Sequence, residues 1–288
     1  MSSPSLRSCL EIYNINTQKR RLLLAADIHF EAPNWSRDGR FLVINSEGLL
    51  YRVALDAPQL IPINTDFAKR CNNDHGISPD GTELVISHHA DEQEGASVIY
   101  RLPIEGGTPV PATEFGPSYW HGWSPDGQYL AYVAGRAQHS DFKIYRLDLR
   151  SGIEEQLTFG PGLDDGPDYS ACGRFIYFNG YRAGKMQIWR MEADGKNPEQ
   201  LIHSAHSDWF PHPSPDGKKL IFLRYLVDQG QAHPFGCDVQ IMLLDLTSGQ
   251  TTALTDIFYG GQGSLNVPCW APDSNEFAFV SYSNLASE

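Results

Sequence analysis

Trp123-Ser124-Pro125-Asp126-Gly127-Gln128-Tyr129-Leu130 is one of six related stretches in this chain of 288 residues. The other five are Trp35-Ser36-Arg37-Asp38-Gly39, Ile77-Ser78-Pro79-Asp80-Gly81, Tyr169-Ser170-Ala171-Cys172-Gly173, Pro213-Ser214-Pro215-Asp216-Gly217 and Trp270-Ala271-Pro272-Asp273-Ser274. Counted from the Ser position, which is Ala271 in the last copy, successive copies lie 42, 46, 46, 44 and 57 residues apart. A sequence period in the forties is typical of a repeat protein in which each repeat forms one supersecondary unit.

Each stretch has the residue types of a tight turn. Pro fixes φ near the value that a type I turn needs, Asp suits the next position, and Gly allows the positive φ from which the chain re-enters a strand. Apolar or alternating runs follow, as in residues 130–133, 143–147 and 155–158 of the third repeat, and these runs predict short strands. Four short strands in about forty residues are typical of one blade of a β-propeller.

The two ends of the chain predict how the ring closes. After the last turn, only one strand is expected, at residues 276–280, so the last blade lacks two of its four strands. Residues 9–13 and 21–24 match the second half of a repeat. We therefore predict an all-β fold, a single six-bladed β-propeller domain over residues 1–288, with four antiparallel strands per blade. The N-terminal strands complete the last blade, and closure removes the exposed sheet edges.

Composition and charge narrow the classes of function. The net charge of −13, from 35 acidic and 22 basic residues, argues against a nucleic-acid partner, because binding to phosphates needs a basic surface. No apolar run is long enough for a membrane helix, so we expect no membrane insertion. The N-terminus lacks the basic and apolar segments of a signal peptide, and the five cysteines show no CxxC spacing. These features predict a cytoplasmic protein with reduced thiols; the alternative is an exported protein that has lost its signal peptide.

The repeat resembles that of TolB-type six-bladed propellers. The resemblance rests on the W-S-P-D-G turn, the I-Y-x-L-D-L strand at residues 144–149 and the E-Q-L-T ending at residues 155–158, and it covers about residues 5–285. Relatives of this repeat include the TolB translocation protein, the propeller caps of prolyl-oligopeptidase-like enzymes, and lyases that cleave oligogalacturonate with a metal held by histidines. The resemblance is specific for the fold and leaves function open. The G-x-S-x-G motif of the hydrolases is absent, since residues 122–126 lack the final Gly.

Candidate site residues are sought where the repeats differ from one another. The strand before each turn is expected to be innermost, with its start at the mouth of the central channel. Side chains alternate along a strand, so the positions three and five residues before the Ser are expected to face the same side. These positions, together with the one two residues before the Ser, predict a ligand-binding set at the channel mouth: His75, His121, His212, Asp165, Asp168, Glu31, Asn73, Tyr119 and Trp209. Asp74 and Asp164 are expected beside this set.

A divalent metal is the candidate cofactor. The imidazoles of His75, His121 and His212, together with nearby carboxylates, suit Zn²⁺, Mn²⁺ or Fe²⁺. The acidic residues in 164–168 offer oxygen ligands for Ca²⁺, although the same residues are equally typical of a turn. Strict metal-binding spacings such as H-x-H or H-E-x-x-H are absent. A wet channel lined with polar side chains explains the same inventory without any metal.

The longest interval between repeats contains an insertion at residues 227–238, with His233, Phe235 and Cys237. Such an insertion forms either a lid over a site or a solvated loop. We predict a TolB-like propeller that acts as a binding scaffold for a protein segment or a small polar ligand at the channel mouth. The alternative is a metal-assisted lyase or hydrolase acting on an acidic sugar, similar to the oligogalacturonate lyases. The sequence leaves the oligomeric state open.

Overall fold

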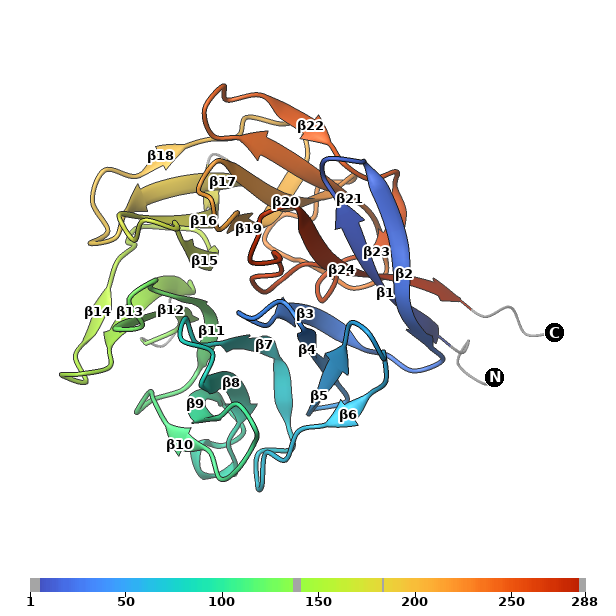
Figure 1. Cartoon of the computed structure of the whole chain (residues 1–288). Coiled ribbons are helices and arrows are strands. Elements are labelled where there is room, and N and C mark those ends of the chain that lie inside the picture. Colours follow the sequence, from blue (N-terminus) through green and yellow to red (C-terminus); the bar gives the residue numbers. More distant parts are fainter. Residues whose placement is uncertain (1–5, 137–140, 183, 285–288) are drawn as a thin grey trace, which may run out of the picture.

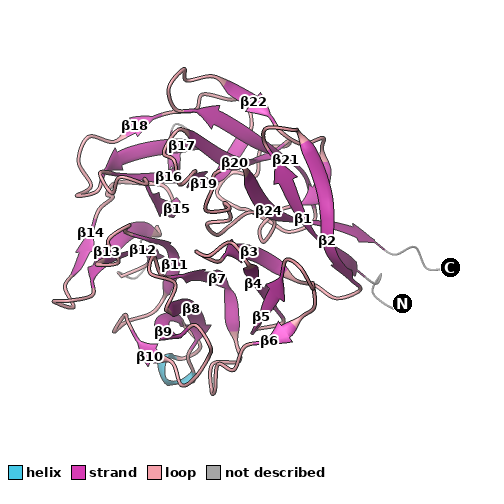
Figure 2. Ribbon diagram, viewed as in Figure 1, coloured by secondary structure: helices cyan, strands magenta, loops and turns pink. Residues whose placement is uncertain are grey.

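The computed structural model of the chain describes residues 6–136, 141–182 and 184–284. Their strands form six sheets arranged as blades around a common axis (Figure 1), which confirms the predicted six-bladed β-propeller. Within the described residues, the only helical element is a 3-10 turn at Asp91–Gln93, and strands dominate throughout (Figure 2). No helix in this part of the chain is both long and apolar enough to cross a membrane.

Five blades follow one another along the chain, each built from four consecutive antiparallel strands. Blade one contains β3 (Glu31–Trp35), β4 (Phe41–Ser46), β5 (Leu49–Ala54) and β6 (Ile61–Pro62). Blade two contains β7 (Cys71–Ile77), β8 (Glu83–His89), β9 (Ser97–Pro103) and β10 (Val110–Pro111). Blade three contains β11 (Ser118–Trp123), β12 (Tyr129–Ala134), β13 (Lys143–Asp148) and β14 (Glu154–Gln156). Blade four contains β15 (Asp164–Tyr169), β16 (Phe175–Arg182), β17 (Lys185–Glu192) and β18 (Glu199–Gln200). Blade five contains β19 (Ser207–Pro213), β20 (Lys219–Tyr225), β21 (Cys237–Asp245) and β22 (Thr251–Ala253), and β23 (Phe258–Gly260) also pairs with β21.

Blade six joins the two ends of the chain. The C-terminal strand β24 (Glu276–Asn284) pairs antiparallel with the N-terminal strand β1 (Leu6–Asn14), which in turn pairs with β2 (Lys19–Ala26). The innermost position of this blade holds only an isolated bridge between Trp270 and Phe277. The predicted closure of the ring by the N-terminal strands is therefore confirmed.

The repeated turns share one hydrogen-bond pattern. In four of them the Ser hydroxyl donates to the Asp two residues later, with Oγ–Oδ1 distances of 2.8 Å at Ser36, 2.6 Å at Ser78 and Ser124, and 2.5 Å at Ser214. The Gly that follows this Asp has a φ between 70° and 75° in each of the four. Cys172 takes the place of the Asp in blade four, with its Sγ 3.5 Å from Ser170 Oγ.

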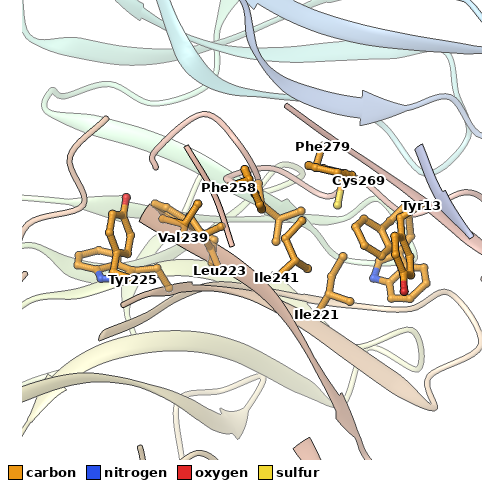
Figure 3. Close-up of a cluster of buried hydrophobic side chains, with 14 of the residues drawn as sticks. Tyr13, Ile221, Leu223, Tyr225, Val239, Ile241, Phe258, Cys269 and Phe279 are labelled. Carbon is orange, nitrogen blue, oxygen red and sulfur yellow. The ribbon is translucent and has the colours of Figure 1, made fainter. Parts of the chain in front are cut away.

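Apolar side chains pack between neighbouring blades. One such cluster joins blade five to the closing blade six and includes Leu223, Ile241 and Phe279 (Figure 3). Tyr13 of β1 stacks on Phe277 in the same cluster, with ring centroids 5.3 Å apart. Burying one large aliphatic or aromatic side chain contributes about 1.5–3 kcal/mol, so this cluster stabilises the contact between the chain ends and the ring.

Each of the five innermost strands is interrupted by a break in register, near the position four residues before the Ser. At this position Ala32, Gly166 and Phe210 have positive φ values of 59°, 59° and 54°. A bulge of this kind adds a residue to one strand and re-aims the side chains around it. The regular alternation assumed from the sequence therefore fails at the point where the site residues are located.

Candidate binding site at the channel mouth

A cavity of about 460 Å³ lies at the end of the channel where the innermost strands of blades two to five begin. Its walls come from four blades and from two loops of blade five. The lining residues are Asn72, Asn73, Asp74, His89, Tyr119, His121, Val133, Phe142, Leu163, Asp165, Phe210, Gln231, His233 and Gln262. Of the residues predicted from the sequence, the cavity brings together Asn73, Tyr119, His121 and Asp165.

Asp165 is the centre of the polar wall. Its Oδ1 lies 3.1 Å from Nε2 of His121 and accepts a hydrogen bond from the amide of Gly166 at 2.7 Å, while its Oδ2 lies 3.6 Å from Nε2 of His233. Burial favours the neutral acid, but the hydrogen bond and charge of His121, with the charge of His233, hold the pKa of Asp165 below its usual value. The carboxylate is therefore ionised at neutral pH and orients both imidazoles.

The two imidazoles held by Asp165 each leave one ring nitrogen without a partner. Within the described part of the chain, Nδ1 of His121 and Nδ1 of His233 are buried and form no hydrogen bond. The His121 side chain is only 5% exposed. Burial lowers its pKa, but the carboxylates of Asp74 and Asp165 outweigh that effect and the pKa is raised. Buried polar atoms normally have partners, so these two nitrogens are unsatisfied polar atoms beside the cavity.

A second acidic wall lies across the mouth. Asp74 accepts a hydrogen bond from Nδ2 of Asn266 at 3.0 Å, and burial with the nearby charge of Asp165 raises its pKa to about 6. Behind this wall, Glu31 accepts a hydrogen bond from Nδ2 of Asn73 at 3.2 Å. Burial raises the pKa of Glu31 to about 7. The mouth therefore contains more acidic groups than can all be ionised at low cost.

The other predicted residues lie elsewhere in the ring. His75 is fully buried, its Nε2 lies 3.2 Å from the carbonyl oxygen of Val43, and burial lowers its pKa to about 4, so it is neutral. Trp209 is also fully buried, and its indole packs against the imidazole of His233 with ring centroids 4.6 Å apart. Both side chains therefore belong to the packing between blades.

His212 and Asp168 form a separate buried pair. Nδ1 of His212 lies 3.0 Å from Oδ2 of Asp168, and its Nε2 lies 2.9 Å from the carbonyl oxygen of Leu265. Asp168 lines a different cavity of about 240 Å³ at the opposite end of the channel, among aromatic residues that include Trp35 and Trp270. The predicted set is thus divided between the two ends.

The three predicted metal ligands do not converge on one site. The nitrogens of His75, His121 and His212 approach different partners on different blades, and no group of three or more His, Cys, Asp or Glu side chains in the described residues has an arrangement suited to a metal ion. The carboxylate of Asp164, considered for Ca²⁺, instead lies 3.3 Å from Lys143 Nζ and 3.2 Å from Arg182 Nη2.

The insertion in blade five supplies residues that the sequence could not place. Gln231 and His233 lie between β20 and β21 and form part of the cavity wall, and Gln231 Oε1 accepts a hydrogen bond from the amide of Leu163 at 2.9 Å. Phe210 also lines the cavity, because its positive φ turns the bulge toward the mouth. Only the position of the insertion in the longest repeat interval signalled this contribution.

The fold and the site together define a closed six-bladed propeller with a polar, partly covered cavity at one mouth. Residues 114–283 match the family model of the TolB beta propeller domain, and the chain belongs to this family. An uncharacterised protein of Agrobacterium fabrum is 51% identical over 279 residues, which are 96% of this chain and 93% of that protein.

Solved structures and TolB itself add to this comparison. A structure from Agrobacterium tumefaciens, provisionally described as TolB, is 50% identical with a TM-score of 0.93, covering 98% of this chain and 100% of that one. The Tol-Pal system protein TolB of Francisella tularensis is 26% identical over 182 residues, which are 62% of this chain but only 39% of that protein. The oligogalacturonate lyase of Vibrio parahaemolyticus is 14% identical with a TM-score of 0.54, over 88% of this chain and 73% of that one, which shows a shared fold alone.

Proposed function

We propose that this propeller is a binding scaffold that holds a small polar ligand, or a short segment of a protein partner, in the cavity at the channel mouth. The observation that carries the proposal is the pair of imidazoles on Asp165. Their Nδ1 atoms are buried and lack a partner among the described residues, and both side chains line a cavity large enough for a small molecule.

The insertion in blade five supports an enclosed ligand. His233 reaches Asp165 from this insertion, and Gln231 is bonded to the backbone of Leu163 in the linker before blade four. The insertion therefore covers part of the cavity while contacting both neighbouring walls. A protein partner would enter the same opening with an extended segment, in line with the similarity to a Tol-Pal system protein.

The alternative of a metal-assisted enzyme acting on an acidic sugar receives less support. The described cavity lining has two carboxylates and contains neither Lys nor Arg, whereas a uronate needs a cation to offset its charge. The three histidines predicted to hold a metal cation, His75, His121 and His212, lie apart from one another. A binding role requires no metal.

Equilibrium dialysis tests the proposal. Purified protein is dialysed against a mixture of small polar metabolites and tripeptides, and retained compounds are identified by mass spectrometry. We expect at least one compound to be retained by the wild type and to be lost from His233→Ala, whose side chain is 26% exposed and lies on the insertion outside the strands of the ring. Asp27→Asn, at an exposed ion pair with Arg7, is the control. Equal retention by all three proteins would place binding outside this cavity.

A further inference from the structure

The charge of the cavity lining restricts what it can bind. Asp74 and Asp165 are the acidic lining residues, and the described lining has no Lys or Arg to balance them. His121 lies between the two carboxylates and its pKa is raised by both. The lining also contains the imidazoles of His89, His121 and His233. A histidine is positively charged only while it is protonated, so the described lining holds no permanent cation to balance its two carboxylates.

The two carboxylates are buried, and no Lys or Arg of the described lining is paired with them. Asp74 is 5% exposed. Glu31 lies beside it and accepts a hydrogen bond from the lining residue Asn73, so a third acidic group lies next to the cavity. Ionised carboxylates in such surroundings are costly unless a cation is paired with them. The raised pKa values of Asp74 and Glu31 reflect this cost, and a bound cation would remove it.

The rest of the wall is aromatic and aliphatic. The ring of Phe210 stacks on His121 with centroids 6.5 Å apart, and Tyr119 packs edge to face with Phe142 at 5.9 Å. Aromatic faces attract organic cations, and apolar walls accommodate a hydrocarbon body. A bare metal ion would use neither feature.

We infer that the ligand of this cavity is an organic ammonium compound, with its cationic amino group beside Asp74 and Asp165 and its apolar body against Tyr119 and Phe210. This inference rests on the proposed binding function and specifies its ligand class. The amino group supplies the permanent positive charge that the described lining lacks.

Three probes of nearly equal size test the inference: phenethylamine, 2-phenylethanol and phenylacetate. Their affinities for the intact protein are measured by isothermal titration calorimetry at pH 7.5. We expect phenethylamine to bind at least about tenfold more tightly than 2-phenylethanol, because only the amine forms a charge pair with the buried carboxylates. Phenylacetate is expected to be the weakest. Asp74→Asn is expected to reduce the affinity for the amine to that for the alcohol, and Asp27→Asn to leave it unchanged.

The comparison among probes needs only the wild-type protein, so it holds even if Asp74→Asn does not fold. Equal affinity for amine and alcohol, or a preference for phenylacetate, would overturn the ammonium inference and leave the binding function standing. Failure of all three probes to bind at millimolar concentration, together with no retained compound in dialysis, would overturn both.

Discussion

Asp74 of blade two accepts a hydrogen bond from Asn266, which lies 192 residues further along the chain, with the two atoms 3.0 Å apart. The bond passes across the mouth of the channel and joins two blades that are separated by blade one. It fixes the Asp74 carboxyl in the cavity wall and supplies a donor to a buried acid. This hydrogen bond therefore links the closing blade to the binding site.

Asn266→Ala is expected to destabilise the protein by about 1–3 kcal/mol, the cost of leaving a buried acceptor without a donor. Removal of the donor also raises the pKa of Asp74 further above about 6, because the hydrogen bond favours the ionised form. Urea unfolding measures the first effect, and carboxyl chemical shifts measured by NMR against pH report the second. An unchanged pKa of Asp74 would show that Asn266 does not support the acid.

Glu31→Gln is expected to become more stable relative to the wild type as the pH rises from about 4.5 to 7. The folded-state pKa of Glu31 is raised to about 7, so the folded protein binds a proton that the unfolded chain has already lost in this window. Stability contributed by the neutral acid is present at low pH and disappears as the pH passes the folded pKa. Urea titration at each pH measures the unfolding free energy of both proteins. The difference between them isolates the contribution of Glu31 from that of the other groups that titrate.

The affinity for an ammonium probe is expected to rise between pH 5.5 and 8. Asp74, with a pKa of about 6, gains its negative charge in this range. This change makes the cavity more negative while phenethylamine stays protonated. Calorimetry in buffers of different ionisation heat measures the accompanying proton release. A pH-independent affinity would mean that Asp74 does not face the amine.

Cys172 is expected to be the first cysteine alkylated by iodoacetamide. It is exposed and occupies the position of the turn Asp, where hydrogen bonds with Ser170 and Arg174 lower its pKa to about 7. The pKa of Cys9 and Cys71 is raised by burial, so these thiols react slowly. Peptide mapping over time gives the order of labelling. Ser170→Ala removes one hydrogen bond to the sulfur and is expected to slow the reaction at pH 7; an unchanged rate would contradict this account.

Gly76→Ala is expected to cost about 1–3 kcal/mol of stability through overpacking. A Cβ at this position would meet the Trp120 indole at 2.0 Å, because β7 and β11 pack closely where the blades converge. Gly135→Ala is the matched control, since its Cβ would find only ordinary contacts of 3.6 Å or more. Thermal and urea denaturation of both variants measure the difference. Equal effects of the two substitutions would mean that the Trp120 contact can relax.

The fold was accessible from the sequence because it is repeated. Four of the six turns carry a Ser–Asp hydrogen bond followed by a positive-φ Gly, and the other two keep part of this pattern, so six weak local signals reinforce one another. The unmatched strands at the two ends fix the closure. Only part of the candidate site could be predicted from the sequence. The position five residues before the Ser identified Asn73, Tyr119 and Asp165 as cavity residues.

Two features of the structure account for the residues that were placed wrongly or missed. The strand bulge adds a residue just where alternation was assumed, so His75 packs between blades while Asp74 faces the mouth. Nothing in the residue types announces this bulge, since Ala32 and Phe210 adopt a positive φ that local sequence disfavours. The direction of His233 was equally hidden, because it depends on how the insertion folds back over blade four.

The insertion between β20 and β21 has a further consequence. It contributes Gln231 and His233 to the cavity, and it leaves and rejoins the blade at the two ends of one hairpin, outside the strands that form the ring. Substitutions confined to this one segment would therefore change the wall of the cavity, and with it the molecules that fit there, while the strands of the ring stay as they are.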